Sequence, residues 1–301
     1  MMSSRKRTES VASVENRDRS NTMGTATRSA RSMTIDKYLP VFSITLGLVF
    51  EDEYGLNFEA FKNPLFWRAV VGEFIGSIFF LFLTISSVIA SDGDIMVVSS
   101  CFGSVILILI YSLQDTSGAH FNPAVTFAGM ISNELSVVRG VTYMIAQVAG
   151  CIVGVALVLA MAPTRFAAYN GGANIVKSDI APGGAFIGEI VCTTLFVLVV
   201  LFATDQIRKD DSPQTYALCS VAIGIAVMVS HFALIGIDGC SINPARSLGS
   251  AVVSGQWDDF WVFIVGPFVG SFLAAFVYDV MRARPQWEAT LTDESKAFGG
   301  L

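Results

Sequence analysis

The chain has 301 residues, of which 53% are hydrophobic and 15% are charged, whereas soluble domains usually carry roughly 25% charged residues. The formal net charge of −6 gives no sign of nucleic-acid binding. The five cysteines are an odd number, which does not fit the paired framework of a small secreted domain. The apolar residues are concentrated in long blocks, so the composition favours a membrane protein.

The N-terminal part of the chain precedes these blocks. Residues 1–37 are polar and rich in Ser and Thr, and we expect a disordered tail there. The apolar run at 39–50 is too short to span a bilayer, so 38–61 is expected to form an interfacial or capping segment. This run also starts too late for a cleaved signal peptide.

Six later segments are long and apolar enough to span a membrane, which needs about 20 residues for about 30 Å of hydrocarbon. One such segment alone would also fit the core of a soluble protein, but six together favour an all-α membrane protein with six transmembrane helices. The segments are 66–90, 95–113, 141–161, 185–203, 217–237 and 261–280. We expect a second polar tail at 285–301.

Basic residues near the ends of the spans indicate the orientation, because cytoplasmic loops carry an excess of Lys and Arg. Arg165 and Lys177 fall on one side, and most of the other cations fall on the opposite side. Both termini are therefore expected in the cytoplasm. The cations on the proposed cytoplasmic side are Lys62, Arg68, Arg139, Arg208, Lys209, Arg282 and Arg284.

The triplet Asn-Pro-Ala occurs twice, each time after a Gly-containing bend and before a short apolar stretch. The short stretches, 125–131 and 246–253, reach only about halfway across a bilayer at 1.5 Å per residue. We therefore expect two re-entrant half-helices. Residues 117–120 and 238–241 lead into them as irregular backbone, which is tolerated at membrane depth only where protein buries it or water lines it.

The two triplets indicate a duplicated chain, with repeats at about 64–162 and 183–284. Each repeat holds three spans, so the second repeat enters the membrane upside down. Inverted repeats place the working site near the midplane, where the halves meet. Two half-helices that enter from opposite faces would meet there N-terminus to N-terminus.

Each half-helix would begin with an asparagine cap and a proline at the first helical position. The asparagine amides can donate to a passing water, and the positive ends of the helix dipoles repel cations, including protons. Carbonyl groups of the irregular backbone would form a ladder of acceptors for a file of water. The triplets are Asn122, Pro123 and Ala124, and Asn243, Pro244 and Ala245; the ladder residues are Gly118, Ala119 and His120, and Gly239, Cys240 and Ser241.

Glu73 and Glu189 are carboxylates inside spans, each following a glycine. Acids within the membrane are costly and usually functional. A proton relay is one interpretation. We favour a brace that accepts hydrogen bonds from the N–H groups of the half-helix loops, because no span offers a Lys or Arg partner.

These motifs resemble the aquaporin (major intrinsic protein) family over roughly 62–284. The resemblance rests on Gly-Ala-His-Phe-Asn-Pro-Ala-Val-Thr at 118–126, Gly-Cys-Ser-Ile-Asn-Pro-Ala-Arg-Ser at 239–247, the two glutamates, and the segments 66–74 and 265–270. It implies a homotetramer in the lipid bilayer, with one pore per subunit and water as the permeant. Plasma membrane is the default location. No cofactor is implied, and the sequence contains no catalytic constellation or Cys/His metal cluster.

The narrowest ring of the family maps onto Phe102, His231, Cys240 and Arg246 in this chain. Arg246 would donate to water and repel cations, and the other three would shape the opening. His231 also fits a simple packing role. His120 could line the cytoplasmic mouth or brace its loop, and the sequence does not separate these two roles.

This ring resembles that of the water-selective branch, so we expect a passive water channel. Relatives that conduct glycerol typically have Gly where this chain has His231, and Asp where it has Ser247. Phe263 and Ile264 depart from the aromatic-Trp pair common in water channels. The alternatives are a broader pore for glycerol, urea or hydrogen peroxide, a junctional or structural membrane protein of the same fold, and an ion-coupled transporter.

Overall fold

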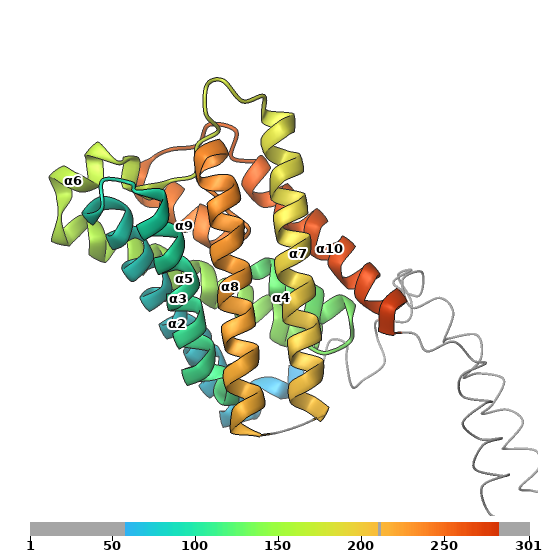
Figure 1. Ribbon diagram of the computed structural model, residues 1–301. Helices are drawn as coiled ribbons and strands as arrows, with labels where there is room; N and C mark the ends of the chain where they lie inside the picture. The colour runs from blue at the N-terminus through green and yellow to red at the C-terminus, as the bar shows by residue number, and fades with distance from the viewer. Residues whose placement is uncertain (1–57, 210–211, 283–301) are drawn as a thin grey trace, which may run out of the picture. The chain divides into compact units, whose positions relative to one another are not determined.

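The computed structural model describes residues 58–209 and 212–282, and these residues form helices and no β-strand (Figure 1). Six helices are long and apolar enough to cross a membrane, which confirms the expected class. They are α2 (Pro64–Ala90), α3 (Ile95–Ser117), α5 (Val137–Met161), α7 (Pro182–Lys209), α8 (Pro213–Asp238) and α10 (Val262–Arg282). The expected polar tails and residues 38–57 lie outside the described residues.

The remaining elements are short. α4 (Pro123–Ile131) and α9 (Pro244–Ser254) follow the two Asn-Pro-Ala triplets and span roughly 15 Å each, about half a bilayer. α6 (Pro163–Ala168) and the 3-10 turns η1 (Phe58–Lys62) and η2 (Asn170–Gly172) were not predicted. They are one or two turns long, which leaves too little periodicity to be recognised in a sequence.

Four of the long helices, α2, α5, α7 and α8, begin two to four residues earlier than the apolar segments suggest, because polar caps and prolines start them. Asn63 caps α2, and its side-chain oxygen accepts from the Leu65 N–H at 2.9 Å. Asp94 caps α3 in the same way, through the Val97 N–H at 2.9 Å. Side-chain oxygens at these positions satisfy N–H groups that the helix leaves free.

The two halves of the chain run in opposite directions. α2 runs from the end of the molecule that carries residues 58–63, here called the lower end, to the end that carries 91–94 and 162–181, the upper end. α7 runs from the upper to the lower end (Figure 1). α2 packs on α5 as α7 packs on α10, while α4 packs on α10 and α9 on α5. Each half-helix is thus held partly by the other repeat.

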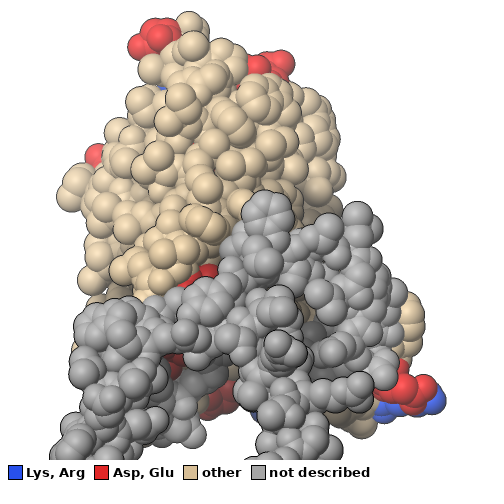
Figure 2. Space-filling model, turned by 90° about the vertical axis from the view of Figure 1, so that its right-hand side faces the viewer, with Lys and Arg blue, Asp and Glu red and all other residues tan. Residues whose placement is uncertain are grey.

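The outer surface of the bundle is apolar. On α2, Val71, Ile75, Phe79 and Leu83 recur every fourth residue and are all exposed. In Figure 2, the part of the face not covered by grey atoms is largely free of charge, with Asp and Glu at its upper end and both Asp or Glu and Lys or Arg at its lower end. An apolar band this extensive belongs in lipid, so the chain is an integral, multi-pass membrane protein.

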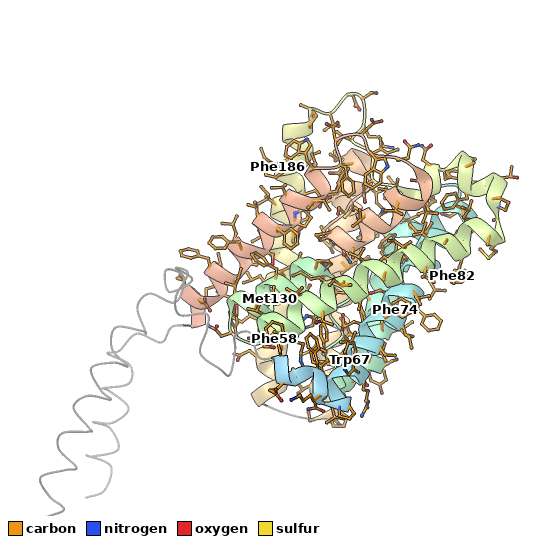
Figure 3. All side chains as sticks on the ribbon, turned by 180° about the vertical axis from the view of Figure 1, so that it is seen from behind. Phe58, Trp67, Phe74, Phe82, Met130 and Phe186 are labelled. Atoms are coloured by element: carbon orange, nitrogen blue, oxygen red, sulfur yellow. The ribbon has the colours of Figure 1, made fainter. Side chains whose placement is uncertain are left out.

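Aromatic side chains mark both ends of this band. Phe58 and Trp67 lie near the lower end, and Phe186 lies near the upper end (Figure 3). The Trp67 indole N–H donates to the Phe61 carbonyl at 2.8 Å, and the Phe186 ring contacts Trp261 with centroids 5.2 Å apart. Trp and other aromatic residues favour the level of the lipid headgroups, so these residues fit the two membrane boundaries.

Glycines allow helices of different halves to touch backbone to backbone. A Cβ at Gly224 of α8 would lie 2.7 Å from the Gly103 carbonyl oxygen, and a Cβ at Gly103 of α3 would lie 2.6 Å from the Gly224 carbonyl oxygen. Neither oxygen can move without shifting a helix. Small residues replace the missing hydrophobic driving force between helices in lipid, so this crossing fixes the distance between α3 and α8.

We therefore predict that Gly224→Val destabilises the protein by about 1–3 kcal/mol or more, because the added methyl groups overpack the crossing. Gly236→Val on the same helix is the matched control, since a Cβ there meets nothing within 4 Å. Thermal unfolding in detergent measures the difference. Equal melting temperatures for the two variants would contradict the crossing.

Candidate functional site

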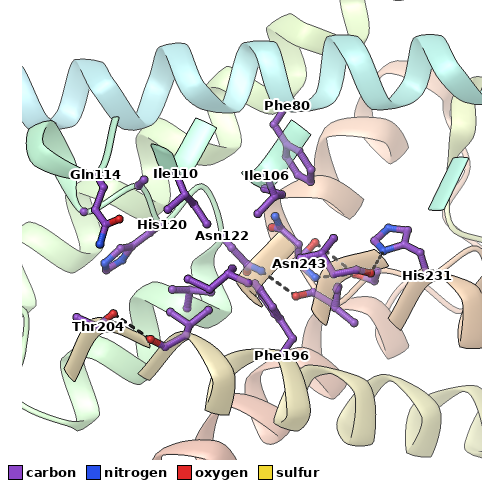
Figure 4. Close-up of a pocket in the computed structure, with 18 residues that line it drawn as sticks. Phe80, Ile106, Ile110, Gln114, His120, Asn122, Phe196, Thr204, His231 and Asn243 are labelled. Carbon is purple, nitrogen blue, oxygen red and sulfur yellow. Dashed lines mark hydrogen bonds between the residues drawn. The ribbon is translucent and has the colours of Figure 1, made fainter. Parts of the chain in front are cut away.

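The two Asn-Pro-Ala triplets meet at the centre of the molecule. The Asn122 side-chain amide donates to the Ile242 carbonyl at 2.8 Å, and the Asn243 amide donates to the Phe121 carbonyl at 2.9 Å. Figure 4 shows the two asparagines side by side in the wall of a cavity. The N-termini of α4 and α9 therefore face each other, each tied to the loop before the other.

Each asparagine also caps its own half-helix. Asn122 Oδ1 accepts from the Ala124 N–H at 2.8 Å, and Asn243 Oδ1 accepts from the N–H groups of Ala245 and Arg246 at 3.0 and 3.2 Å. An amide NH₂ has two donors. The contact with the opposite loop uses one, so each asparagine keeps one donor for a molecule in the cavity.

The loops before the half-helices have a strained backbone. Ala119, Phe121, Cys240 and Ile242 have φ values of 55°, 47°, 53° and 44°. Non-glycine residues adopt this left-handed region rarely, and two of these four are bulky. Such a backbone persists only where its surroundings fix it. In each loop it turns two successive N–H groups toward the same side, where a glutamate accepts from both.

Glu73 provides such surroundings in the first half. Its fully buried carboxylate accepts from the N–H groups of His120 at 3.0 Å and Phe121 at 2.7 Å. It also accepts from the Ser117 hydroxyl at 2.6 Å and the Gln147 amide at 2.8 Å. A carboxylate can accept four such bonds, and these four donors compensate for removing the charge from water.

Glu189 has the corresponding place in the second half. It accepts from the N–H groups of Ser241 at 2.6 Å and Ile242 at 2.7 Å, and it is also fully buried. Loop N–H donors for both glutamates were expected from the sequence. Ser117 and Gln147 were not identified as donors; the only signal for Gln147 was its polar side chain within a largely apolar span.

A narrow cavity of about 40 Å³ runs past the two asparagines. His120 and Gln114 lie at one end and His231 at the other (Figure 4). Apolar side chains that include Phe80, Ile106 and Phe196 line much of the wall between them. A cavity needs about 10–15 Å³ to hold a water molecule, so this one accommodates a few waters in a row.

Wider cavities continue the line at both ends. At the lower end a cavity of about 370 Å³ shares Gln114, His120 and Thr204 with the narrow one. At the upper end a cavity of about 250 Å³ is lined by Tyr169, Lys177 and Arg246, among others. A narrow middle section is thus flanked by two wider vestibules, and it shares lining residues with the lower one.

The predicted ring residues gather between the narrow section and the upper vestibule. Phe102 and His231 contact with ring centroids 4.0 Å apart, and the Arg246 guanidinium lies 5.4 Å from the centre of the Phe102 ring. Arg246 Nη1 donates to the Gly172 carbonyl at 2.8 Å. Cys240 adjoins them on its loop and has a fully buried side chain.

Two polar atoms of this ring lack a hydrogen-bond partner among the described residues: His231 Nε2 and Arg246 Nε. The other histidine nitrogen, Nδ1, lies 2.8 Å from the Val227 carbonyl and must donate to it. Nε2 is then an acceptor. The ring therefore contains one acceptor and one donor that no described residue satisfies.

His120 lies at the lower end of the narrow cavity. Its ring lines the narrow section and the lower vestibule. Its Nδ1 lies 3.1 Å from the Thr126 hydroxyl, and its ring packs edge-on against Tyr143 with centroids 5.8 Å apart. These contacts hold the ring at the lower entrance.

A polar cluster fixes the loops around the upper vestibule. Asp92 accepts from the Tyr169 hydroxyl at 2.8 Å and from the Arg165 guanidinium. The Tyr169 hydrogen bond, followed by the hydrogen bond and charge of Arg165, lowers the pKa of Asp92 below its ordinary value. A lowered carboxylate pKa means that this contribution to stability is present near neutral pH and is lost on acidification through the folded-state pKa.

We predict that Glu73→Gln destabilises the protein by at least about 2 kcal/mol. A glutamine has one acceptor oxygen in place of two, so buried N–H or O–H groups lose their partner, at about 1–3 kcal/mol each. Glu59→Gln, at an exposed acid beside Lys62, should change stability by no more than about 0.5 kcal/mol. Thermal unfolding that ranks the two variants alike would disprove the brace.

Comparison with known proteins agrees with this geometry. The family model described as Major intrinsic protein matches residues 60–278. Aquaporin PIP2-7 of Musa acuminata is 38% identical over 242 residues, which cover 76% of this chain and 86% of the relative. Aquaporin PIP2-1 of Arabidopsis thaliana is 39% identical over 240 residues, with 74% and 84% covered.

A solved structure, the aquaglyceroporin from Plasmodium falciparum, aligns with a TM-score of 0.64 at 26% identity, covering 71% of this chain and 96% of that one. The family match extends from the 3-10 turn before α2 to the last turns of α10. It includes both half-helices and both glutamates. The chain therefore belongs to the major intrinsic protein family.

Proposed function

We propose that this protein is a passive water channel that excludes ions and protons. The observation that carries the proposal is the pair of asparagine amides beside the narrow cavity, each with one N–H donor that the opposite loop does not use. The curated relatives are named aquaporins, which agrees with water as the permeant. Such a pore needs no cofactor and performs no chemical reaction.

The half-helices supply the barrier to protons in this proposal. Each helix N-terminus carries roughly half a positive charge, and α4 and α9 direct both toward the same point. A water that accepts from Asn122 and Asn243 turns its hydrogens outward, so waters on either side orient away from the centre. The carbonyl groups of residues 118–120 and 239–241 then guide the file, and no continuous chain of donors remains for proton hopping.

The ring of Phe102, His231, Cys240 and Arg246 would set the size limit. Phe102 packs against both polar members, and the Gly172 carbonyl holds the guanidinium in place. One fixed donor and one fixed acceptor suit a water molecule. A permanent cation at this point repels other cations, which argues against ion-coupled transport.

We further propose a homotetramer in the plasma membrane, with a channel domain at 62–284 and both termini in the cytoplasm. The orientation is supported by Lys62, Arg68 and Arg139, which lie near the lower end of the bundle. Glu73 and Glu189 act as braces for the loops and take no part in conduction.

The test is osmotic swelling of vesicles that contain the purified protein. We expect water permeability several-fold above that of protein-free vesicles and glycerol permeability at the protein-free level. Water permeability equal to that of protein-free vesicles, with the protein folded, would favour a structural role. Fast glycerol entry would favour a broader pore, the second candidate, because the structural relative is an aquaglyceroporin.

The ring has its own prediction. His231→Gly combined with Arg246→Val should widen the opening and raise glycerol permeability at least about tenfold, since both substitutions remove bulk and polar atoms. Phe232→Gly is the matched control, because it places a glycine at the next residue of α8, whose side chain is exposed. Glycerol exclusion by the double variant would refute the ring assignment.

A further inference from the structure

The two buried glutamates occupy equivalent positions but have different surroundings. Ser117 and Asp238 are each the last residue of a helix, and each precedes a glycine with left-handed backbone, Gly118 at φ 89° and Gly239 at φ 84°. Ser117 donates its hydroxyl to Glu73. In the second half the equivalent residue, Asp238, is itself a carboxylic acid and not a hydroxyl donor.

The second half also lacks a counterpart of Gln147, the other side-chain donor to Glu73. A Cβ at Gly150 would meet the Phe74 carbonyl oxygen, and a Cβ at Gly270 would meet the Ile190 carbonyl oxygen. Phe74 and Ile190 each follow the glutamate, so Gly150 and Gly270 are equivalent. Three residues before Gly150 lies Gln147, a donor to Glu73; three residues before Gly270 lies Pro267, which has no donor. Among the described residues, Glu189 thus keeps only its two N–H partners.

Asp238 and this glutamate bind the same loop before α9. Three successive N–H groups are divided between the two acids: Cys240 donates to Asp238 Oδ1 at 2.9 Å, while Ser241 and Ile242 donate to Glu189. The two carboxylates interact electrostatically. Asp238 is fully buried, and its Oδ2 has no hydrogen-bond partner in the part of the chain that the structure describes.

Two ionised carboxylates cannot share a buried site without a large cost, and such pairs commonly retain one proton between them. The charged or titratable groups that face this pair are the Arg246 guanidinium and the thiols of Cys192 and Cys240. Arg246 donates to the Gly172 carbonyl, and within the described residues no hydrogen bond joins its guanidinium to either acid. We propose that Glu189 and Asp238 form a proton-binding site that holds one shared proton.

The bound proton replaces the donor that Ser117 provides in the first half. It also makes Asp238 a positioning residue for the ring. The Asp238 carbonyl accepts from the Ile175 N–H at 3.0 Å, three residues after Gly172, whose carbonyl holds Arg246. Its side chain holds the Cys240 N–H. Loss of the proton places two anions where the loop before α9 meets residues 172–175. Their repulsion strains the ring that contains Cys240 and Arg246.

Infrared spectroscopy of the full-length protein in lipid tests the site, because a protonated carboxyl group has its own C=O stretch. We expect this band in the wild type at neutral pH, its retention in Asp94→Ser, which alters an exposed helix cap, and its loss in Asp238→Ser and Asp238→Asn. Asp238→Ser reproduces the first half of the chain, so it should fold. A band of unchanged intensity in both Asp238 variants, or no band in the wild type, would overturn the proposal.

The positioning role rests on the proposed water channel and has a separate readout. Water permeability of the wild type should fall at least about twofold as alkaline pH removes the infrared band, while the permeability of Asp238→Ser, whatever its absolute value, should not change with pH. Identical profiles would refute the positioning role. If no variant conducts water, the channel function fails, and the infrared result still decides the proton site.

Discussion

The structure depends on one constraint: backbone N–H and C=O groups within a bilayer must find partners inside the protein, because lipid offers none. Two stretches of non-helical backbone end at the middle of the bundle, before α4 and α9. Glu73 and Glu189 bind their N–H groups on one side. This leaves the loop carbonyls available for the asparagine of the opposite half or for water.

The same arrangement explains why the halves cannot be separated. Asn122 bonds to Ile242, Asn243 bonds to Phe121, and the Ser271 hydroxyl on α10 donates to the Ala124 carbonyl on α4. Gly103 and Gly224 bring α3 and α8 into backbone contact. Each half-helix is therefore positioned by side chains of the other repeat, and the channel forms only where both repeats meet.

Much of the fold could be predicted from the sequence, since six long apolar segments and two Asn-Pro-Ala triplets have few physical solutions in a membrane. The six spanning helices are confirmed, and caps such as Asn63 extend the starts of some of them. The chemistry of Glu73 and Glu189 was foreseeable because a buried acid without a cation needs N–H donors. Their roles in conduction stay predictions.

Other features could not be read from the sequence. Gln147 and Ser117 act through contacts with residues far along the chain, and no local pattern announces such contacts. Asp238 looked like an ordinary residue of an irregular loop. The difference between the two halves appears only in the structure: Asp238 is buried, and its Oδ2 has no hydrogen-bond partner among the described residues, whereas the equivalent Ser117 donates to Glu73.

The central claim is that two facing half-helix termini let water pass while interrupting proton transfer. Simultaneous recording of water and proton flux in the same protein-containing vesicles tests it most directly. The account predicts rapid swelling with a proton flux no greater than in protein-free vesicles. Proton flux that rises in proportion to water flux as more protein is incorporated would contradict it.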